Sequence, residues 1–325
     1  MKRAAPLPWL VPALIALALF SLLPGRAGWL LPWPRGGADA QLARLILWDL
    51  HLPRLVLALL VGGALGLAGA VLQGLTRNPL AEPGLLGISS GASLGAVVAI
   101  YSGLGAAFAL AVPLLGLAGA LLATMLTLLV GAGGGVLALI LAGAAVSGTL
   151  LAGTALVLNL APNPYAAYEI SHWMLGSLAD RSWDQVGLAA PFVVAGMALL
   201  LATGPALDAL SLGEQQAASL GVDLAALRRR VVVGTALAVG AATAVTGTIG
   251  FIGLLAPYLV RGAVGHSPRR TLLPAALMGA LLLLGADVVA RLLPLTQELQ
   301  LGVLTGLIGS PFFLWLVWRL QRESP

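Results

Sequence analysis

Long uncharged stretches separated by short charged segments dominate the chain. A helix needs about 20 apolar residues to cross the hydrocarbon core of a bilayer, and most of the stretches between successive charged residues reach or exceed that length. They are residues 4–25, 55–76, 83–168, 185–207, 231–260, 271–286 and 299–318. The pattern predicts an all-α polytopic membrane protein.

Glycine-rich breaks and charge placement divide the two longest stretches. Residues 103–105 (Gly-Leu-Gly) and 131–135 (Gly-Ala-Gly-Gly-Gly) separate residues 83–168 into three spans of the required length. Residues 231–260 lie between two groups of arginines, and their 30 positions fall short of the roughly 40 that two full crossings need. We therefore predict one full helix to about Thr246, a sharp turn within residues 247–253, and a short or broken helix carrying Pro257.

The first stretch and the basic residues set the orientation. Residues 4–25 follow Lys2 and Arg3, as in a signal peptide, but they exceed the roughly 7–15 residues of a signal-peptide apolar region, so we favour a retained first span. Lys and Arg are retained on the cytoplasmic side. With the N-terminus inside, 11 of the 17 Lys and Arg residues lie inside, namely Lys2, Arg3, Arg77, Arg228, Arg229, Arg230, Arg261, Arg269, Arg270, Arg319 and Arg322. The prediction is about ten transmembrane helices with both termini cytoplasmic.

Small residues in the second span predict where that helix lies. Gly62, Gly63, Gly66 and Gly69 follow one another at short spacings. Because glycine lets helix backbones approach closely, we expect this span to pack inside the bundle.

Composition supports membrane insertion and excludes several classes of protein. Apolar residues make up 59% of the chain and charged residues 9%, with a mean hydropathy of +1.00, whereas soluble domains carry about 25% charged residues. The net charge of +5 is scattered and forms no basic face, so we expect no nucleic-acid partner. With no Cys and three His, the chain cannot build a disulfide framework or a Cys/His metal cluster. We expect no metal and no cofactor.

The residue composition also argues against catalysis by this chain. Its one lysine, Lys2, lies outside any glycine-rich phosphate loop, so a pump built on this chain needs a separate ATPase. At membrane depth there are no paired carboxylates, no zinc motif and no Ser/His pair. A secondary transporter driven by an ion gradient is the alternative, but it normally needs intramembrane carboxylates. Here Asp287 approaches a span with Arg291 four residues on, so an internal ion pair and a binding role both stay open.

Two polar segments are candidate functional sites. Residues 208–230 form the largest predicted inner insertion, in which Gly213 and Gly221 separate two short helical pieces. The insertion is longer than a connection needs, so it is a candidate docking element for a soluble partner, with an ordinary amphipathic loop as the alternative. Residues 161–184 predict a short periplasmic helix with interfacial Trp anchors. His172 there is interpreted as a surface residue, and Arg54 at the outer mouth either binds a partner or extends to the interface.

An ordered set of motifs resembles the FecCD-type permeases of ABC importers for iron-siderophore, haem and cobalamin. These motifs are His51-Leu-Pro-Arg54, Gln73, residues 77–87 (RNPLAEPGLLG), Ser90-Gly91-Ala92, residues 173–177 (WMLGS), Leu212-Gly213-Glu214, Leu220-Gly221, residues 250–254 (GFIGL), Asp287, Arg291, Glu298, Gly302-Val303 and residues 309–312 (GSPF). They cover nearly the whole length of the chain. Residues 78–87 are especially similar to cobalamin permeases.

The resemblance implies an assembly and roles for particular residues. Residues 1–325 would be one permease domain of a homodimer in the lipid of the bacterial inner membrane, with two ATP-binding subunits below and a periplasmic substrate-binding protein above. The segment at about 208–230 would be the cytoplasmic coupling loop and that at about 160–185 a periplasmic segment. Coupling to the ATPase would involve Leu212, Gly213, Glu214, Leu220 and Gly221. The binding protein would dock on Arg54, Arg291 and His51, and His51 stands where the family has a third arginine. The pore and gate would be bordered by Gly133, Gly134, Gly135, Ser147, Thr149 and Thr154.

Overall fold

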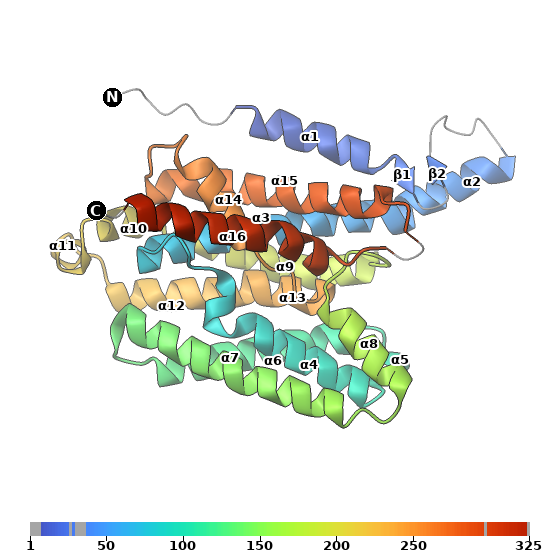
Figure 1. Ribbon diagram of the computed structural model, residues 1–325, viewed down its shortest axis with the longest axis horizontal. Coiled ribbons are helices and arrows are strands. Elements are labelled where there is room, and N and C mark those ends of the chain that lie inside the picture. Colours follow the sequence, from blue (N-terminus) through green and yellow to red (C-terminus); the bar gives the residue numbers. More distant parts are fainter. Residues whose placement is uncertain (1–7, 26–27, 30–36, 296–297, 324–325) are drawn as a thin grey trace.

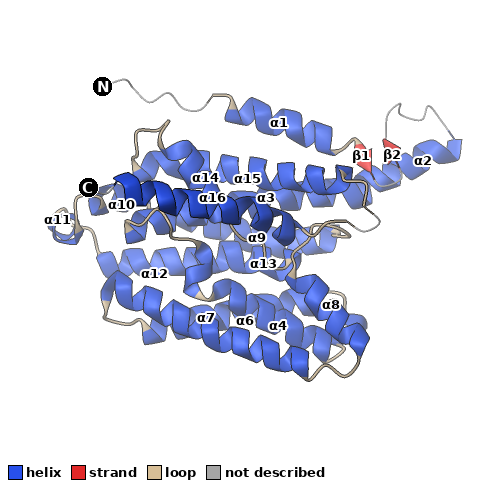
Figure 2. Cartoon of the chain, viewed as in Figure 1, coloured by secondary structure: helices blue, strands red, loops and turns tan. Residues whose placement is uncertain are grey.

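The protein is built almost entirely of helices (Figures 1 and 2). The computed structural model describes residues 8–25, 28–29, 37–295 and 298–323. In the first half of the chain the helices are α1 (Leu10–Ser21), α2 (Gly37–Leu45), the π-helical η1 (Ile46–His51), α3 (Leu52–Thr76), the 3₁₀ turn η2 (Pro83–Leu86), α4 (Ile88–Tyr101), α5 (Leu104–Ala107), α6 (Ala111–Val130) and α7 (Gly135–Asn159). Two short strands, β1 (Pro24–Gly25) and β2 (Gly28–Trp29), pair antiparallel between α1 and α2.

The second half of the chain continues the bundle. Its helices are α8 (Pro164–Met174), α9 (Trp183–Leu201), α10 (Gly204–Leu210), α11 (Glu214–Ser219), α12 (Leu224–Thr235), the π-helical η3 (Ala236–Gly240), α13 (Ala241–Thr246), α14 (Ile252–Arg261), α15 (Pro268–Leu292) and α16 (Leu301–Glu323). The long helices run roughly side by side, with α10 and α11 at one end and α2, α5 and α8 at the other (Figure 1).

Several helices have the length and composition of membrane spans. Among the described residues, six are long and apolar enough: Ala40–Thr76, Ala111–Val130, Gly135–Asn159, Trp183–Leu201, Pro268–Leu292 and Leu301–Arg319. Three shorter apolar helices accompany them, Leu10–Ser21, Ile88–Tyr101 and Ile252–Arg261. The chain is therefore an all-α, multi-pass membrane protein, as the hydrophobic pattern predicts.

The predicted helix breaks are confirmed. Residues 83–168 contain the helices α4, α6 and α7, separated at residues 102–110 and 131–134, and α4, with 14 residues, is shorter than the predicted span. In the difficult stretch 231–260, α13 ends at Thr246, and Gly247 adopts a φ of 73° that non-glycine residues rarely adopt. Residues 247–251 are not helical, and α14, which carries Pro257, begins at Ile252. Too few residues remain in this stretch for a second full membrane crossing, so its last helix, α14, is short.

The second predicted span begins earlier than expected. Its helix is continuous from Ala40 to Thr76, a length of 37 residues, and passes through the π-helical turn η1. Arg54 limits the predicted apolar stretch 55–76, yet it lies on the helix, as do Arg44 and Asp49 before it. Charged side chains at a helix end can extend to the interface or pair with one another, so they mark the end of the apolar segment and not the end of the helix.

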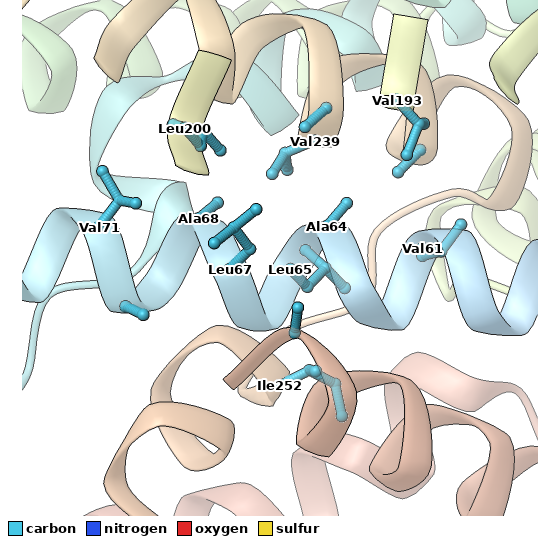
Figure 3. Close-up of a cluster of buried hydrophobic side chains, with 14 of the residues drawn as sticks. Val61, Ala64, Leu65, Leu67, Ala68, Val71, Val193, Leu200, Val239 and Ile252 are labelled. Carbon is cyan, nitrogen blue, oxygen red and sulfur yellow. The ribbon is translucent and has the colours of Figure 1, made fainter. Parts of the chain in front are cut away.

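Helix α3 lies at the centre of the bundle, in contact with α9, α14 and α15. Figure 3 shows Val61, Leu67 and Val71 of α3 among apolar side chains of neighbouring helices such as Val193 of α9. A Cβ added to Gly62 would lie 2.5 Å from the carbonyl oxygen of Gly279 in α15. The small residues thus permit backbone contact, and the predicted interior position of this span is confirmed.

One glycine of α3 gives a stability prediction. A Cβ at Gly69 would overlap the backbone of Gly253, just inside α14, and that backbone cannot move aside as a flexible side chain could. We expect Gly69→Ala to destabilise the fold by about 1–3 kcal/mol or more, measured as a lower melting temperature in detergent. Gly187→Ala in α9 is the matched control, because an added Cβ there meets nothing within 4 Å. Equal melting temperatures for the two variants would contradict the packing of α3 against α14.

Candidate functional site

The segment between α9 and α12 forms a short helix on two glycine hinges. Gly213, with a φ of 108°, precedes α11, and Gly221, with a φ of 85°, follows it. Both conformations favour glycine because a Cβ would be strained there. The N–H of Gly221 also donates to the carbonyl of Ala218 at 2.9 Å. The predicted division of residues 208–230 by these two glycines is confirmed.

The base of this segment is fixed to the transmembrane bundle. Oδ1 of Asp208 in α10 accepts hydrogen bonds from the hydroxyl of Ser267 at 3.1 Å and the backbone N–H of Arg269 at 3.0 Å, both at the start of α15. Leu207 and Leu210 are fully buried. The helix that follows, α12, is capped at its N-terminus, because Asp223 accepts from the N–H of Ala226 at 2.9 Å. This bond lowers the pKa of Asp223, so the carboxylate stays charged at the helix N-terminus.

The tip of the segment exposes apolar side chains. Leu212 is 63% exposed and Leu220 is 65% exposed, one on each side of α11, whereas Ala217 between them is buried. Glu214 is only half-buried in the first turn. Exposed leucines on either side of a short helix suit a contact with another protein. We call Leu212, Gly213, Glu214, Leu220 and Gly221 the hinge segment.

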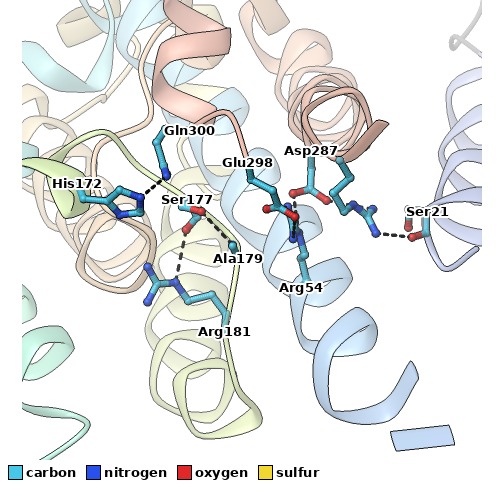
Figure 4. Close-up of polar contacts among 10 residues, drawn as sticks. Ser21, Arg54, His172, Ser177, Ala179, Arg181, Asp287, Glu298 and Gln300 are labelled. Carbon is cyan, nitrogen blue, oxygen red and sulfur yellow. Dashed lines mark hydrogen bonds and ion pairs between the residues drawn. The ribbon is translucent and has the colours of Figure 1, made fainter. Parts of the chain in front are cut away.

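At the opposite end of the bundle, two arginines and two carboxylates form a neutral network (Figure 4). Arg54 Nε lies 2.8 Å from Asp287 Oδ1, and its Nη1 and Nη2 donate to the two carboxylate oxygens of Glu298 at 3.2 and 3.0 Å. Arg291 Nη2 lies 3.1 Å from Asp287 Oδ2. The predicted ion pair between Asp287 and Arg291 is confirmed. Glu298, which is not among the predicted site residues, completes the charge balance.

This network also connects α1 to the bundle. Arg291 Nη1 donates to the carbonyl of Ser21 at 2.8 Å, and His51 Nδ1 donates to the carbonyl of Leu22 at 2.9 Å. The side chains of Arg54 and Arg291 are 11% and 5% exposed, and Asp287 is fully buried. The three residues expected to contact a binding protein therefore lie together, but each is engaged within the chain.

The expected gate residues are spread along one helix. Gly133, with a φ of 82°, and Gly134 lie in the exposed turn before α7, and Gly135, with a φ of 75°, is the half-buried first residue of that helix. Ser147 shares a 2.7 Å hydrogen bond with Ser90 of α4. Thr149 is exposed, whereas Thr154 is buried, and each hydroxyl donates to a carbonyl one turn earlier. The structure brings Ser147 to a second helix but does not join the set into one site.

A short helix covers the end of the bundle that carries the ion network. Helix α8 confirms the helix predicted within residues 161–184, and its His172 is exposed and lies 2.7 Å from Gln300 Nε2 (Figure 4). Arg181 follows this helix, where its Nε donates to the carbonyl of Ser177 at 3.4 Å and burial lowers the pKa of its guanidinium. Among the described residues no group of three His, Asp or Glu side chains could hold a metal ion.

The polar contacts between distant segments are not predictable from the sequence. Arg261 of α14 donates to Gln73 of α3 at 2.6 Å across 188 positions, and Arg54 reaches Glu298 across 244 positions. No spacing rule connects such residues. The presence of Gln73 and Arg261 at the ends of two apolar stretches was the one available signal.

Comparison with known proteins supports a single family. The FecCD transport family matches residues 13–319. The vitamin B12 import system permease protein BtuC of Klebsiella pneumoniae is 39% identical over 321 residues, 96% of this chain and 92% of the relative. The hemin transport system permease protein HmuU of Yersinia pestis is 41% identical over 282 residues, 85% of this chain and 84% of the relative. An uncharacterised ABC transporter permease, YvrB of Bacillus subtilis, is 40% identical over 293 residues, 88% of this chain and 82% of the relative.

Solved structures agree with the sequence relatives. A metal-chelate type ABC transporter in an inward-facing conformation superposes with a TM-score of 0.86 at 32% identity, over 95% of this chain and 97% of the other. The match to the family over nearly all of the described residues, the full-length relatives and the shared fold lead to one conclusion: this chain belongs to the FecCD transport family.

Proposed function

We propose that this chain is the membrane-spanning permease subunit of a binding-protein-dependent ABC importer for a metal chelate, an iron-siderophore, haem or cobalamin. Its relatives named for vitamin B12 and hemin import, and a structural neighbour described as a metal-chelate transporter, support this class of substrate. A separate ATPase drives alternating access, and the permease itself is not an enzyme. The cognate binding protein selects the chelate, so measuring which of the three that protein retains identifies the cargo.

We further propose ten membrane crossings with both termini in the cytoplasm of a bacterial inner membrane. The crossings are α1, α3, α4, α6, α7, α9, the run α12–η3–α13, the stretch ending in α14, α15 and α16. The start of α1 and the end of α16 lie at the same end of the bundle as α11 (Figure 1), which supports this arrangement. Because the chain has no Cys, Gln215→Cys gives a single label site. Labelling of that thiol from the periplasm would overturn the orientation.

The proposal depends chiefly on the hinge segment. An exposed apolar tip on a base hydrogen-bonded to α15 is what a coupling element needs: the tip contacts an ATP-binding subunit, and the base passes its movement to the membrane helices. Two such subunits serve the homodimer, and the whole of residues 1–325 forms one permease domain. No observation among the described residues favours the ion-driven alternative, since Asp287 and Glu298 are both paired with arginine.

Charge placed on the exposed leucines tests this function. Leu212→Asp and Leu220→Asp replace apolar side chains that are more than half exposed, so the permease should fold. We expect at least about a tenfold loss in affinity for the ATP-binding subunits, because an interface core does not tolerate an unpaired charge. Co-purification and titration of the ATPase measure it. Gln215→Glu, which adds the same charge to α11 without removing a leucine, is the control; equal effects of the three changes would contradict the leucine contact.

The periplasmic segment at about 160–185 and the ion network define the proposed docking end. Acidic groups of a binding protein would meet Arg54, Arg291 and His51 there, in competition with Asp287 and Glu298. Such a contact should weaken as salt is added, and an affinity independent of salt would remove these residues from the docking surface.

We also propose that Gly133, Gly134, Gly135, Ser147, Thr149 and Thr154 border the pore, where weakly polar groups pass cargo without holding it. Cysteines at Thr149 that never react in any transport state would exclude that residue.

A further inference from the structure

A pocket lined by both apolar and basic residues lies at the end of the bundle that carries the hinge segment. Its volume is about 230 Å³, and it lies between the end of α3, the connection from α14 to α15, and the connection that follows α10. The polar side chains of its lining are Gln73, Arg77, Ser211, Arg261, His266 and Thr271. The lining includes two arginines and a histidine but no acidic residue.

Gln73, which lines this pocket, carries a buried donor without a partner. Its Oε1 accepts from Arg261 Nη2 at 2.6 Å, which fixes the orientation of the amide. The amide Nε2 is buried and has no hydrogen-bond partner. Exchanging the amide oxygen and nitrogen would set the NH₂ group against the guanidinium, so that alternative does not relieve the problem. A buried donor without a partner costs about 1–3 kcal/mol, which an acceptor brought to this amide would recover.

The positive side chains have no acidic partners either. Among the described residues, no carboxylate pairs with Arg77, Arg261 or His266. The guanidinium of Arg261 lies 5.5 Å from the ring centre of Tyr258, an aromatic contact that leaves its charge uncompensated. Asp208, close in the fold, is bonded to the start of α15 and does not line the cavity.

The start of α15 adds to the positive potential. Pro268 and Thr271, in the first turn of this 25-residue helix, line the cavity. The N-terminus of a helix carries a partial positive charge and attracts anions. Gln73, the two arginines and the start of α15 therefore line one pocket from three different segments of the chain.

We infer that this cavity binds a phosphate group. A tetrahedral anion supplies several acceptor oxygens at once, so it can receive hydrogen bonds from Gln73 Nε2 and from both guanidiniums. The phosphate can come from the headgroup of an anionic phospholipid or from free phosphate, since basic pockets at the cytoplasmic ends of membrane helices bind lipid headgroups. Because Ser211 adjoins the hinge segment, a bound phosphate links that segment to α3 and α14.

Two substitutions test the site without relying on transport. Arg261→Gln removes the charge beside Gln73, and Arg77→Asn removes an exposed cation while keeping a residue that tolerates the φ of 51° at this position. The purified full-length chain, stripped of lipid, is titrated with phosphatidylglycerol under native mass spectrometry and with inorganic phosphate by calorimetry. We expect one phosphate-bearing ligand per parent chain and about tenfold weaker binding for each variant.

Comparing the two ligands shows whether the phosphate comes from a lipid headgroup or from solution. The control variant tests whether binding depends on this pocket. Retention of phosphatidylglycerol alone indicates a lipid headgroup, whereas binding of inorganic phosphate indicates a soluble anion. Arg270→Gln removes an exposed charge from the same turn of α15 without touching the cavity lining. Binding of neither ligand overturns the inference, as does an equal loss in Arg270→Gln. If Arg261→Gln does not elute as a folded species, Arg77→Asn alone decides, because the Arg77 side chain is exposed.

Discussion

Gly221→Pro is expected to reduce ATP hydrolysis stimulated by loaded binding protein to the unstimulated level in the assembled importer. Gly221 has a φ of 85°, whereas the proline ring fixes φ near −65°. Proline also lacks the N–H that Gly221 donates to Ala218 at 2.9 Å. The turn after α11 must therefore change direction, so Leu220 can no longer face the ATPase from the same position.

A conservative substitution at the same position distinguishes the effect of changing the turn geometry from the effect of replacing the glycine. Gly221→Asn keeps the N–H and tolerates a positive φ at small cost, and an added Cβ meets nothing within 4 Å. It should retain most of the stimulated hydrolysis. Both variants are compared for melting temperature and for co-purified ATPase, so that loss of coupling is distinguished from loss of assembly. Full stimulation in Gly221→Pro would remove this turn from the coupling route and would count against the proposed function.

Local rules of sequence accounted for the helix boundaries that depend on glycine. The turns at Gly213, Gly221 and Gly247 have positive φ values, and such conformations can be anticipated because few other residues adopt them. The break after Thr246 followed from counting residues against bilayer thickness. The start of the helix that leads into α3 could not be found in this way, since charged residues there belong to the helix and not to a loop.

Contacts across the bundle could be predicted only where the partners are close in sequence. Asp287 and Arg291 are four residues apart on one helix, so their ion pair was predictable. Arg54 joins them from 233 positions away, by a packing of α3 against α15 that no periodicity encodes. The expected docking role for Arg54 was based on its charge, its location and the resemblance to the family, none of which reveals the internal carboxylates that the fold brings to it. The phosphate cavity depends equally on distant segments.

The ion network gives the largest expected stability effect. Asp287 is fully buried and contacts both Arg54 and Arg291. Asp287→Asn leaves two guanidiniums with a single carboxylate, that of Glu298, in a site with little access to water. Removing one partner of a buried ion pair costs about 3–5 kcal/mol, so the melting temperature of the purified permease should fall sharply. Asp49→Asn, at an exposed position on the same helical run as α3, should have little effect.

A second substitution should restore part of this loss if charge balance is the cause. In the double variant Asp287→Asn with Arg291→Gln, Arg54 and Glu298 remain as a neutral, doubly hydrogen-bonded pair. The double variant should then be more stable than the sum of the two single changes predicts, and a double-mutant cycle on melting free energies measures the difference. Strictly additive losses would mean that Asp287 and Arg291 stabilise the fold independently. In that case the four side chains would be neighbours with separate roles, and the attachment of α1 through Ser21 would depend on Arg291 alone.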